Sequence, residues 1–468
     1  MLTALVNYFY PDLNEEDSKK FTLLSLTFFL IIGAYWLARL LKNAIFYKVA
    51  FPEELGWLPG QGRLFQPVAK FWSPFIVFGM VMIYTKLIDM FKKHVLFYII
   101  GGVYSIVFGF ITGALILRSV YGDVFLGKWV LAAVGWGAFF AIESYGSLVV
   151  SLFWSFTNSI CTTGSSKSGY PMIIAAAQIG GIGGSACMLF AHKIDHWVLF
   201  ALVTIFVVCA LLSMRHFMHS IPAEQMLEAK SNSAKGAAEK KKQNALESLF
   251  AGIKLILTRP YVFGILIVST LYEVIGQVVE YQMQTQADSS PLFSSAASFA
   301  QFQGMYGVAT NLLSFLMALL GTRYLIKRFG LTFGLLFYPI TLGTSFMMLF
   351  GLYTYGNPTP NQLLGATFIV MMIAKGLGYA VNNPVKEMMY IPTSKDTKFK
   401  AKGFIDVFGG RMSKLGGAQI NNAFKHNMHH LMVYGTMFSL GITGIWVLAA
   451  LYVGYKNKLL IKNNKIVE

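Results

Sequence analysis

A lysine and a glutamate lie side by side in this sequence, in a polar stretch that directly follows a strongly apolar run. The apolar run covers residues 363–374 and the polar stretch covers residues 382–392, so Lys386 and Glu387 are expected near the inner end of a membrane span. A charged side chain at bilayer depth is costly, and such charges commonly line a substrate or ion path. The alternative is that Lys386 only extends its ammonium group to the lipid headgroups.

Ionisable residues inside the other apolar runs extend this picture, and the basic ones outnumber the acidic ones. A basic cavity near the membrane midplane suits a multiply anionic substrate, because arginine binds phosphate or carboxylate in a fork and lysine acts as a point charge. The acidic side chains are expected to pair with the bases while the cavity is empty. The charged residues in the expected spans are Arg39, Lys42, Lys70, Glu143, Glu273, Glu280, Lys375, Lys386, Glu387, Lys402, Asp406, Arg411 and Lys414.

Most of this set, together with one asparagine, are candidates for substrate binding. Arg39 and Lys42 are three residues apart and therefore share a helix face. Asp406 follows Lys402 by four residues, so a purely structural pair between these two is an alternative to a role in the site. The candidates are Arg39, Lys42, Lys70, Glu143, Asn158, Glu280, Lys386, Glu387, Lys402, Asp406, Arg411 and Lys414.

Three asparagines are expected at helix ends beside these charges, namely Asn158, Asn382 and Asn383. Their amide groups suit hydrogen bonds to a base or a ribose. The alternative is that they satisfy backbone groups left without partners where Pro384 interrupts a helix.

The composition requires that these residues be held by membrane helices. Of the 468 residues, 55% are hydrophobic and 13% are charged, whereas a soluble domain carries about 25% charged residues. Apolar runs of roughly 20 residues cross about 30 Å of hydrocarbon, and they predict an all-α integral membrane protein with twelve transmembrane helices. The expected spans are 22–42, 67–88, 95–117, 129–158, 170–192, 197–215, 260–283, 299–325, 331–352, 362–392, 401–425 and 431–455, of which 129–158 and 362–392 are long enough to be tilted or broken.

The twelve spans divide into two six-helix halves that resemble each other. Residues 160–184 and 391–417 both place a Thr/Ser/Lys cluster before a span with two glycine pairs, at an offset of about 231–233 residues. Glycine pairs allow close helix packing, and tandem repeats around a central site are a common transporter plan. We predict an N-terminal bundle over 1–220, a polar cytoplasmic linker over 221–250 and a C-terminal bundle over 251–468.

The lysines and arginines between the spans predict the topology. They gather in alternate loops and in the C-terminal tail, whereas the loops 284–298 and 353–361 carry none. Because cytoplasmic loops are enriched in Lys and Arg, both termini are expected on the cytoplasmic side. The formal net charge of +17 therefore reflects topology, and we expect no nucleic-acid partner.

Several kinds of chemistry have no support in the sequence. The three cysteines show no paired spacing, and His426, His429 and His430 have no carboxylate or cysteine nearby, so we expect neither a metal nor another cofactor. Nucleophile-elbow, Walker A and zincin motifs are absent. These observations favour a transporter over a membrane-embedded enzyme.

The charged motifs also resemble those of a known family, the nucleotide transporters of plastids and obligate intracellular bacteria, or ATP/ADP translocases. The similarity runs along nearly the whole chain, and its most specific parts are residues 384–392 and 400–418. The matching segments are RLLKN at 39–43, PVAKFW at 67–72, ESYGS at 143–147, FWSFTN at 153–158, VE at 279–280, PVKEMMYIP at 384–392, KAKGFIDV at 400–407 and KLGGA at 414–418.

This resemblance implies a twelve-helix antiporter with a major-facilitator-like fold. The four charged positions that the family ties to transport are Lys42, Glu143, Glu280 and Lys386. By this analogy the two lysines, one in each half, bind substrate phosphate, and the two glutamates neutralise them while the carrier is empty. Three positions depart from the family pattern, because Asn43 and Asn383 replace aspartates and Leu415 replaces a small hydroxyl residue.

The sequence thus predicts a monomeric secondary active transporter that moves nucleotides across the inner membrane of an intracellular bacterium by alternating access. Its partners would be ATP, ADP or a related nucleotide and the lipid bilayer. The lost aspartates leave one alternative open, the same fold carrying another organic anion. A further alternative, from a different class, is a transport-inactive membrane scaffold or lipid scramblase.

Overall fold

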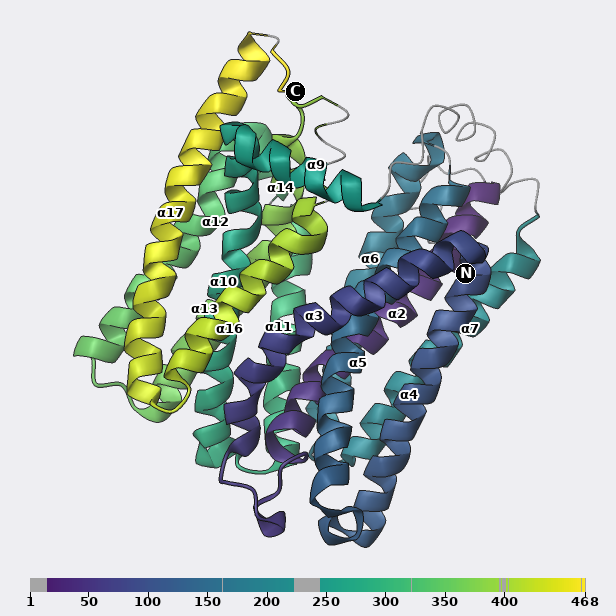
Figure 1. The fold of residues 1–468 in the computed structure, drawn as a ribbon, viewed down its shortest axis with the longest axis vertical. Coiled ribbons are helices and arrows are strands. Elements are labelled where there is room, and N and C mark those ends of the chain that lie inside the picture. Colours follow the sequence, from purple (N-terminus) through teal and green to yellow (C-terminus); the bar gives the residue numbers. More distant parts are fainter. Residues whose placement is uncertain are drawn as a thin grey trace. The chain divides into compact units, whose positions relative to one another are not determined.

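The computed structural model describes residues 15–161, 163–222, 245–320, 322–394, 397, 401–402, 404–463 and 465–467. Within these residues the chain is helical and contains no β-strand (Figure 1). A single isolated bridge joins Thr393 to Val467. The all-α fold expected from the sequence is therefore confirmed for the described residues.

The chain forms two compact units, which are described one at a time. Unit 1 draws its described residues from Met1–Gly62, Phe75–Lys241 and Phe293–Val308, and unit 2 from Arg63–Pro74, Lys242–Leu292 and Ala309–Glu468. The predicted linker 221–250 falls mostly on residues 223–244, which lie outside the described residues, so the predicted domain boundaries stay a prediction.

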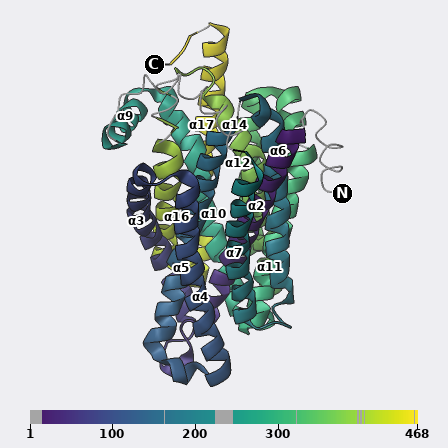
Figure 2. The ribbon, with the colours of Figure 1, turned by 90° about the vertical axis from the view of Figure 1, so that its right-hand side faces the viewer.

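Unit 1 is built around α2, which contacts α5, α6 and α7, while α4 contacts α5 and α7 (Figure 2). The helices of the first half are α2 (Glu15–Lys48), α3 (Gln61–Met90), α4 (Lys93–Tyr121), α5 (Asp123–Ile160), α6 (Thr163–Cys187) and α7 (His196–Ser220), with short 3-10 turns at Glu53–Leu55 and Met188–Phe190.

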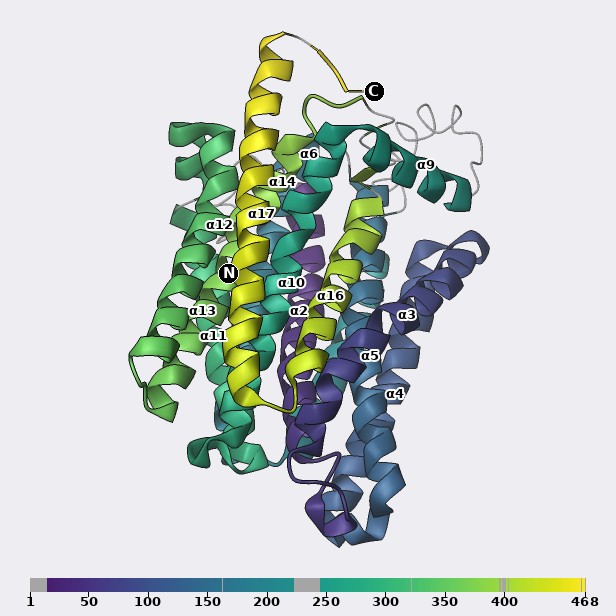
Figure 3. The same cartoon turned by 60° about the vertical axis from the view of Figure 1, so that its left-hand side comes forward.

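Unit 2 repeats this arrangement around α10, which contacts α13, α16 and α17, while α12 contacts α13 and α17 (Figure 3). The helices of the second half are α9 (Ala245–Thr258), α10 (Pro260–Ser289), α11 (Ala296–Leu320), α12 (Thr322–Tyr355), α13 (Pro360–Leu377), α14 (Asn383–Met389), α16 (Gly410–Phe424) and α17 (Met428–Lys462), with a 3-10 turn at Pro291–Phe293. The first, third, fourth, fifth and sixth spans of each half thus make the same contacts, which confirms the six-helix repeat.

Each of the twelve predicted spans coincides with helical structure. Among the described residues, nine helices are long and apolar enough to cross a membrane. The other three predicted spans are formed by α11, by α13 with α14, and by α16. Helices satisfy every backbone hydrogen bond internally, which the hydrocarbon of the bilayer requires.

Two of these spans begin at a glycine whose backbone conformation is rare for other residues. Gly127 and Gly330 have φ values of 76° and 79° and interrupt α5 and α12. Because glycine reaches positive φ without steric cost, each separates a short leading segment from the span itself. This explains why the hydrophobic pattern predicted starts at 129 and 331.

The expected break in the span 362–392 is also present. The helix passes from α13 through a π-helical turn, Gly378–Asn382, into α14. A second π-helical turn, Ile405–Gly409, precedes α16. Such turns shift the register of a helix and are frequent at functional sites, and both flank the charged motifs of unit 2.

The glycine pairs bring helices together within each unit, as the sequence predicts. Gly184 of α6 packs on the backbone of Gly33 in α2, and Gly417 of α16 packs on Val274 in α10. The neighbouring Gly416 faces open space. Of the pair Gly416 and Gly417, only Gly417 is therefore required for close packing.

Substituting alanine for Gly417 is expected to lower the free energy of unfolding by about 1–3 kcal/mol, the usual cost of overpacking. A Cβ at Gly417 would lie 2.7 Å from the Val274 carbonyl oxygen. The matched control is Gly416→Ala, which is expected to be neutral or slightly stabilising because alanine favours the helix. Thermal unfolding in detergent compares the two, and equal midpoints would contradict the packing argument.

Candidate functional site

The centre of the candidate site in unit 1 is an ion pair between α2 and α5. Lys42 Nζ lies 2.5 Å from Glu143 Oε1, and the two side chains are 2% and 22% exposed. The same ammonium group lies 4.3 Å from the centre of the Phe139 ring. Burial makes each charge depend on the other. The contact fits the prediction that two glutamates neutralise the lysines of the empty carrier, and that role stays a prediction.

The other candidates of unit 1 lie around this pair at different distances along the helices. The Arg39 guanidinium stacks over the Trp36 ring at 5.1 Å. Asn158, at the far end of α5, accepts a hydrogen bond from the Tyr170 hydroxyl at 2.5 Å. Asn158 therefore belongs to an α5–α6 contact.

The asparagine that departs from the family pattern in unit 1 has a local partner. Asn43 is 3% exposed, and its Nδ2 donates to Oε1 of Gln303, at 3.4 Å. An amide pair of this kind is neutral. Asparagine at position 43, where the family pattern has an aspartate, therefore removes a negative charge while the Asn43 amide nitrogen still has a hydrogen-bond partner.

In unit 2 two ion pairs join α14 to the start of the next span. Lys386 Nζ lies 4.0 Å from Asp406 Oδ1, and Lys402 Nζ lies 2.6 Å from Glu387 Oε1. The Lys386 side chain is 16% exposed. A lysine that is held by a carboxylate and largely covered does not merely extend towards headgroups, so the first interpretation of Lys386 is favoured.

These pairs bear on an alternative that the sequence left open. That alternative was a structural pair between Lys402 and Asp406, four residues later, but the ion pair of Lys402 is with Glu387. Asp406 lies within the π-helical turn Ile405–Gly409, which changes the angular spacing on which the i, i+4 rule depends. Lys386 forms its ion pair with Asp406, and the expected role of Glu280 as one of the two neutralising glutamates stays a prediction.

The remaining candidates of unit 2 are buried or half-buried. Glu280 is 3% exposed and accepts a hydrogen bond from Gln277, one turn earlier on α10. Lys70 is 9% exposed, and Arg411 is half-buried in the first turn of α16.

Asn382 is a buried polar group in the π-helical turn beside these charges. Its side chain is 4% exposed, and its Nδ2 has no hydrogen-bond partner in the part of the chain that the structure describes. The side chain of Asn383 lies outside the described residues. An unsatisfied buried donor is costly, and the predicted hydrogen bond from Asn382 to a ligand stays a prediction.

A further cluster of charged side chains in unit 2 was predicted only in part from the sequence. Glu273 of α10 lies 3.4 Å from Lys375 Nζ of α13 and 3.9 Å from Lys414 Nζ of α16. Lys414 was a candidate, whereas Glu273 and Lys375 were noted as intramembrane charges but not assigned to the site. Their positions in the repeat, 231 and 232 residues after Lys42 and Glu143, were the available signal.

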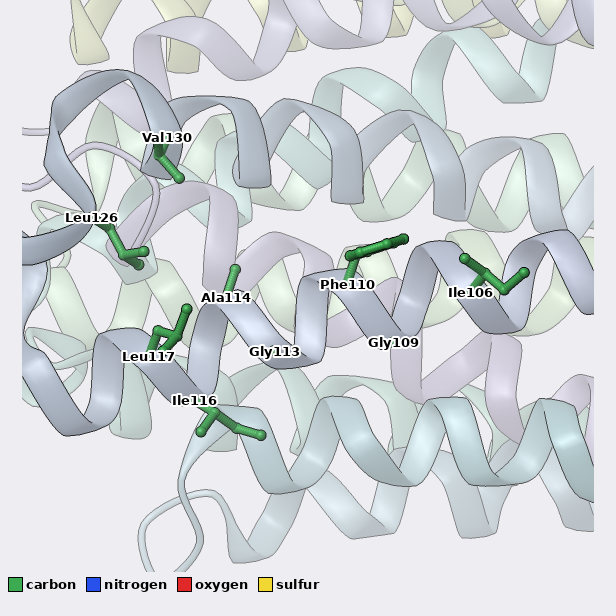
Figure 4. Close-up of a pocket in the computed structure, with 9 residues that line it drawn as sticks. All are labelled: Ile106, Gly109, Phe110, Gly113, Ala114, Ile116, Leu117, Leu126 and Val130. Atoms are coloured by element: carbon green, nitrogen blue, oxygen red, sulfur yellow. The ribbon is translucent and has the colours of Figure 1, made fainter.

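A cavity of about 740 Å³ in unit 1 is lined by none of these charged residues (Figure 4). Its lining is entirely apolar, and two of its residues, Ile106 and Phe110, are 61% and 76% exposed. It is therefore suited to contact with lipid and not to an anionic ligand. The lining residues are Ile106, Gly109, Phe110, Gly113, Ala114, Ile116, Leu117, Leu126 and Val130.

Comparison with known proteins places this geometry in a family. A sequence model of the TLC ATP/ADP transporter family matches residues 1–455. The chain belongs to this family. The TLC carriers are membrane transport proteins and not enzymes, which agrees with the expectation from the motifs.

Relatives of this TLC chain occur in plants and in intracellular bacteria. The chain is 26% identical to the chloroplastic ADP,ATP carrier protein 2 of Arabidopsis thaliana over 487 residues, which cover 92% of this chain and 74% of that protein. It is 25% identical to ADP,ATP carrier protein 1 of Chlamydia pneumoniae over 518 residues, which cover 99% of this chain and 95% of that protein.

Solved structures similar to this TLC chain show its fold. A peptide transporter POT in complex with sulfate has a TM-score of 0.62 at 14% identity, covering 93% of this chain and 95% of that one. A mutant of the nucleoside transporter NupG has a TM-score of 0.54 at 15% identity, covering 93% of this chain and 98% of that one. The expected major-facilitator-like fold is thus confirmed.

Proposed function

We propose that this protein is a secondary active transporter that exchanges nucleotides, ATP and ADP or close relatives, by alternating access. The TLC family membership and the ADP,ATP carriers among its relatives support this proposal. In the proposal, substrate phosphate competes with Glu143 for Lys42 and with Asp406 for Lys386.

One observation carries the proposal furthest: both lysines of the family motifs are held in ion pairs inside their units. A lysine whose charge is balanced by a nearby carboxylate can exist in a membrane without a ligand and still bind one when the carboxylate is displaced. This arrangement supports a carrier that is stable both empty and loaded.

The unsatisfied amide of Asn382 supports a cargo with an uncharged polar part. Its Nδ2 is a donor, and nucleotides offer acceptors on the ribose and the base. Asn382 lies four residues before Lys386. In the proposal this one segment supplies an amide for the ribose or base and an ammonium group for the phosphate.

The proposal also includes the setting of the carrier. We place it as a monomer in the inner membrane of an intracellular bacterium, with both termini in the cytoplasm. The relatives in Chlamydia and the distribution of lysines between loops support this placement.

The decisive experiment measures uptake of labelled ATP, ADP, GTP and NAD into bacterial cells that express the full chain. We expect uptake of at least one of them, accelerated when the cells are preloaded with unlabelled nucleotide, because an antiporter requires a counter-substrate. Protein that is folded and inserted but takes up none of the four would refute the proposal.

A second candidate is transport of another organic anion by the same fold. The neutral Asn43–Gln303 contact favours it, because this position carries an aspartate in the family pattern. A thermal-shift screen separates the candidates. Stabilisation by a carboxylate or a sugar phosphate, and by no nucleotide, would favour the second.

A further inference from the structure

A second cavity of unit 1 lies where α4 begins and α7 ends, and its lining is mostly polar. Its volume is about 450 Å³, and sites for small molecules typically have volumes of about 300–1,000 Å³. The two helices that supply the lining contact each other. None of the lining residues is a candidate for the transport site. They are His94, Tyr98, Arg215, Met218 and His219.

The side chains of this cavity are of the kinds that bind a phosphate group. Arg215 is exposed, and it forms no ion pair with a carboxylate of the residues that the structure describes. A guanidinium group can donate two parallel hydrogen bonds to a phosphate. A hydrogen bond of 2.9 Å between His219 Nδ1 and the Arg215 carbonyl oxygen holds the imidazole ring on the same helical turn. The hydroxyl group of Tyr98 is a further donor.

Two lysines add positive charge at this end of unit 1. Lys19 of α2 donates a hydrogen bond to the carbonyl oxygen of Ser220, the residue after His219, at 3.4 Å. Lys93, the residue before His94, donates to the carbonyl oxygen of Ser155 at 2.9 Å. The distribution of lysines between the loops predicts that this end is cytoplasmic. Anionic lipids of a cytoplasmic leaflet are attracted to such basic surfaces, and basic pockets between membrane helices bind their headgroups.

An apolar stripe on α7 leads from the membrane interior to this cavity. Ile205, Val208 and Leu212 are 51%, 39% and 57% exposed. Their spacing of three and four residues places them on one helix face, and Arg215 and His219 continue that face with the same spacing. At 1.5 Å per residue the stripe is about 10 Å long, a large part of one leaflet's share of about 30 Å of hydrocarbon. A ligand that fits both the stripe and the cavity has an apolar chain below a charged head.

From these observations we infer that the cavity, called here the α4–α7 site, binds the phosphate headgroup of an anionic phospholipid from the cytoplasmic leaflet. Arg215 binds the phosphate, and an acyl chain of the lipid lies along the stripe on α7. A soluble phosphate compound would leave the stripe without a partner. The α4–α7 site shares no residue with the proposed transport site, so the two proposals succeed or fail separately.

The test is thermal unfolding of the purified full-length protein in detergent, with increasing amounts of dioleoylphosphatidylglycerol or dioleoylphosphatidylcholine. We expect the anionic lipid to raise the unfolding midpoint until the effect saturates, because a ligand that binds only the folded state stabilises it. The zwitterionic lipid, with the same chains, is expected to have little effect. Equal shifts with the two lipids would overturn the inference.

Arg215→Gln tests the residue that is expected to bind the phosphate. We expect the apparent affinity for dioleoylphosphatidylglycerol to fall by about tenfold or more, the effect of losing one charge-assisted hydrogen bond. The midpoint without lipid should stay that of the parent, because Arg215 is exposed. Arg259→Gln, at an exposed arginine before α10, is the matched control and should keep the parent affinity. If Arg215→Gln binds the lipid as tightly as the parent, the inference is wrong.

A comparison of chain lengths on the parent protein identifies the source of the phosphate and needs no variant. Dihexanoylphosphatidylglycerol and glycerol phosphate carry the same headgroup chemistry with short chains and with none. We expect stabilisation to decrease in this order, because less apolar surface is buried on the stripe. Glycerol phosphate that stabilises the protein as well as the long-chain lipid would show a site for soluble phosphate compounds and would overturn the assignment to a lipid.

Discussion

Replacing Lys42 with methionine is expected to abolish exchange and to lower the free energy of unfolding by about 3 kcal/mol. The methionine keeps the apolar stem that packs near Phe139, but Glu143 loses the ammonium group at 2.5 Å. Removing one partner of a buried ion pair costs about 3–5 kcal/mol, because the other charge is left uncompensated. Since Glu143 is 22% exposed, the lower end of that range applies.

The double variant separates the structural role of the pair from its role in transport. Lys42→Met combined with Glu143→Gln removes both charges, so most of the stability is expected to return while exchange stays absent. Thermal unfolding in detergent and exchange in proteoliposomes are measured on the same preparations. Lys193→Met, at an exposed lysine of unit 1, is the control. Recovery of exchange in the double variant would show that Lys42 serves stability alone.

Replacing Lys386 with alanine is expected to weaken substrate binding by about 2–3 kcal/mol, or roughly 30- to 150-fold. That is the range for a hydrogen bond to a charged group. The fold should persist, because the Lys386–Asp406 distance is 4.0 Å and the Asp406 side chain is 45% exposed, a geometry that contributes little stability. The expected loss of affinity in Lys386→Ala therefore reflects weaker substrate binding and not unfolding of the protein.

Two further variants define what Lys386 contributes. Lys386→Arg keeps the charge but changes its geometry, so partial binding is expected. Asp406→Asn removes the carboxylate that competes for the lysine, so binding is expected to hold or tighten while exchange slows. Equilibrium binding and exchange rates decide between these outcomes. If Lys386→Ala binds every tested anion as tightly as the parent, the site lies elsewhere.

The two lysines also indicate why the empty carrier tolerates charge in the membrane. Lys42 and Lys386 each face a carboxylate from a different helix of the same unit. An ion pair of this kind hides the charge from the hydrocarbon and leaves it available to a stronger ligand.

The helices, the repeat and the identities of the charged residues could all be predicted from the amino-acid sequence. Every predicted span coincides with helical structure, because the bilayer accepts only segments whose backbone groups are paired internally. The glycine pairs and the 231-residue offset predicted two similar halves, and the contacts of α2 and α10 repeat as expected. These features depend on local composition and period, which a sequence displays directly.

Which charged side chains pair with each other could not be predicted from the sequence and depends on how the helices pack. Lys402 and Asp406 have the spacing of a helical pair, but Asp406 lies in a π-helical turn and Lys402 pairs with Glu387. Glu273 and Lys375 meet across 102 residues, and no local pattern links them. An ion pair between helices depends on the register and packing of both, so its partners are set by the assembled unit and not by spacing along the chain.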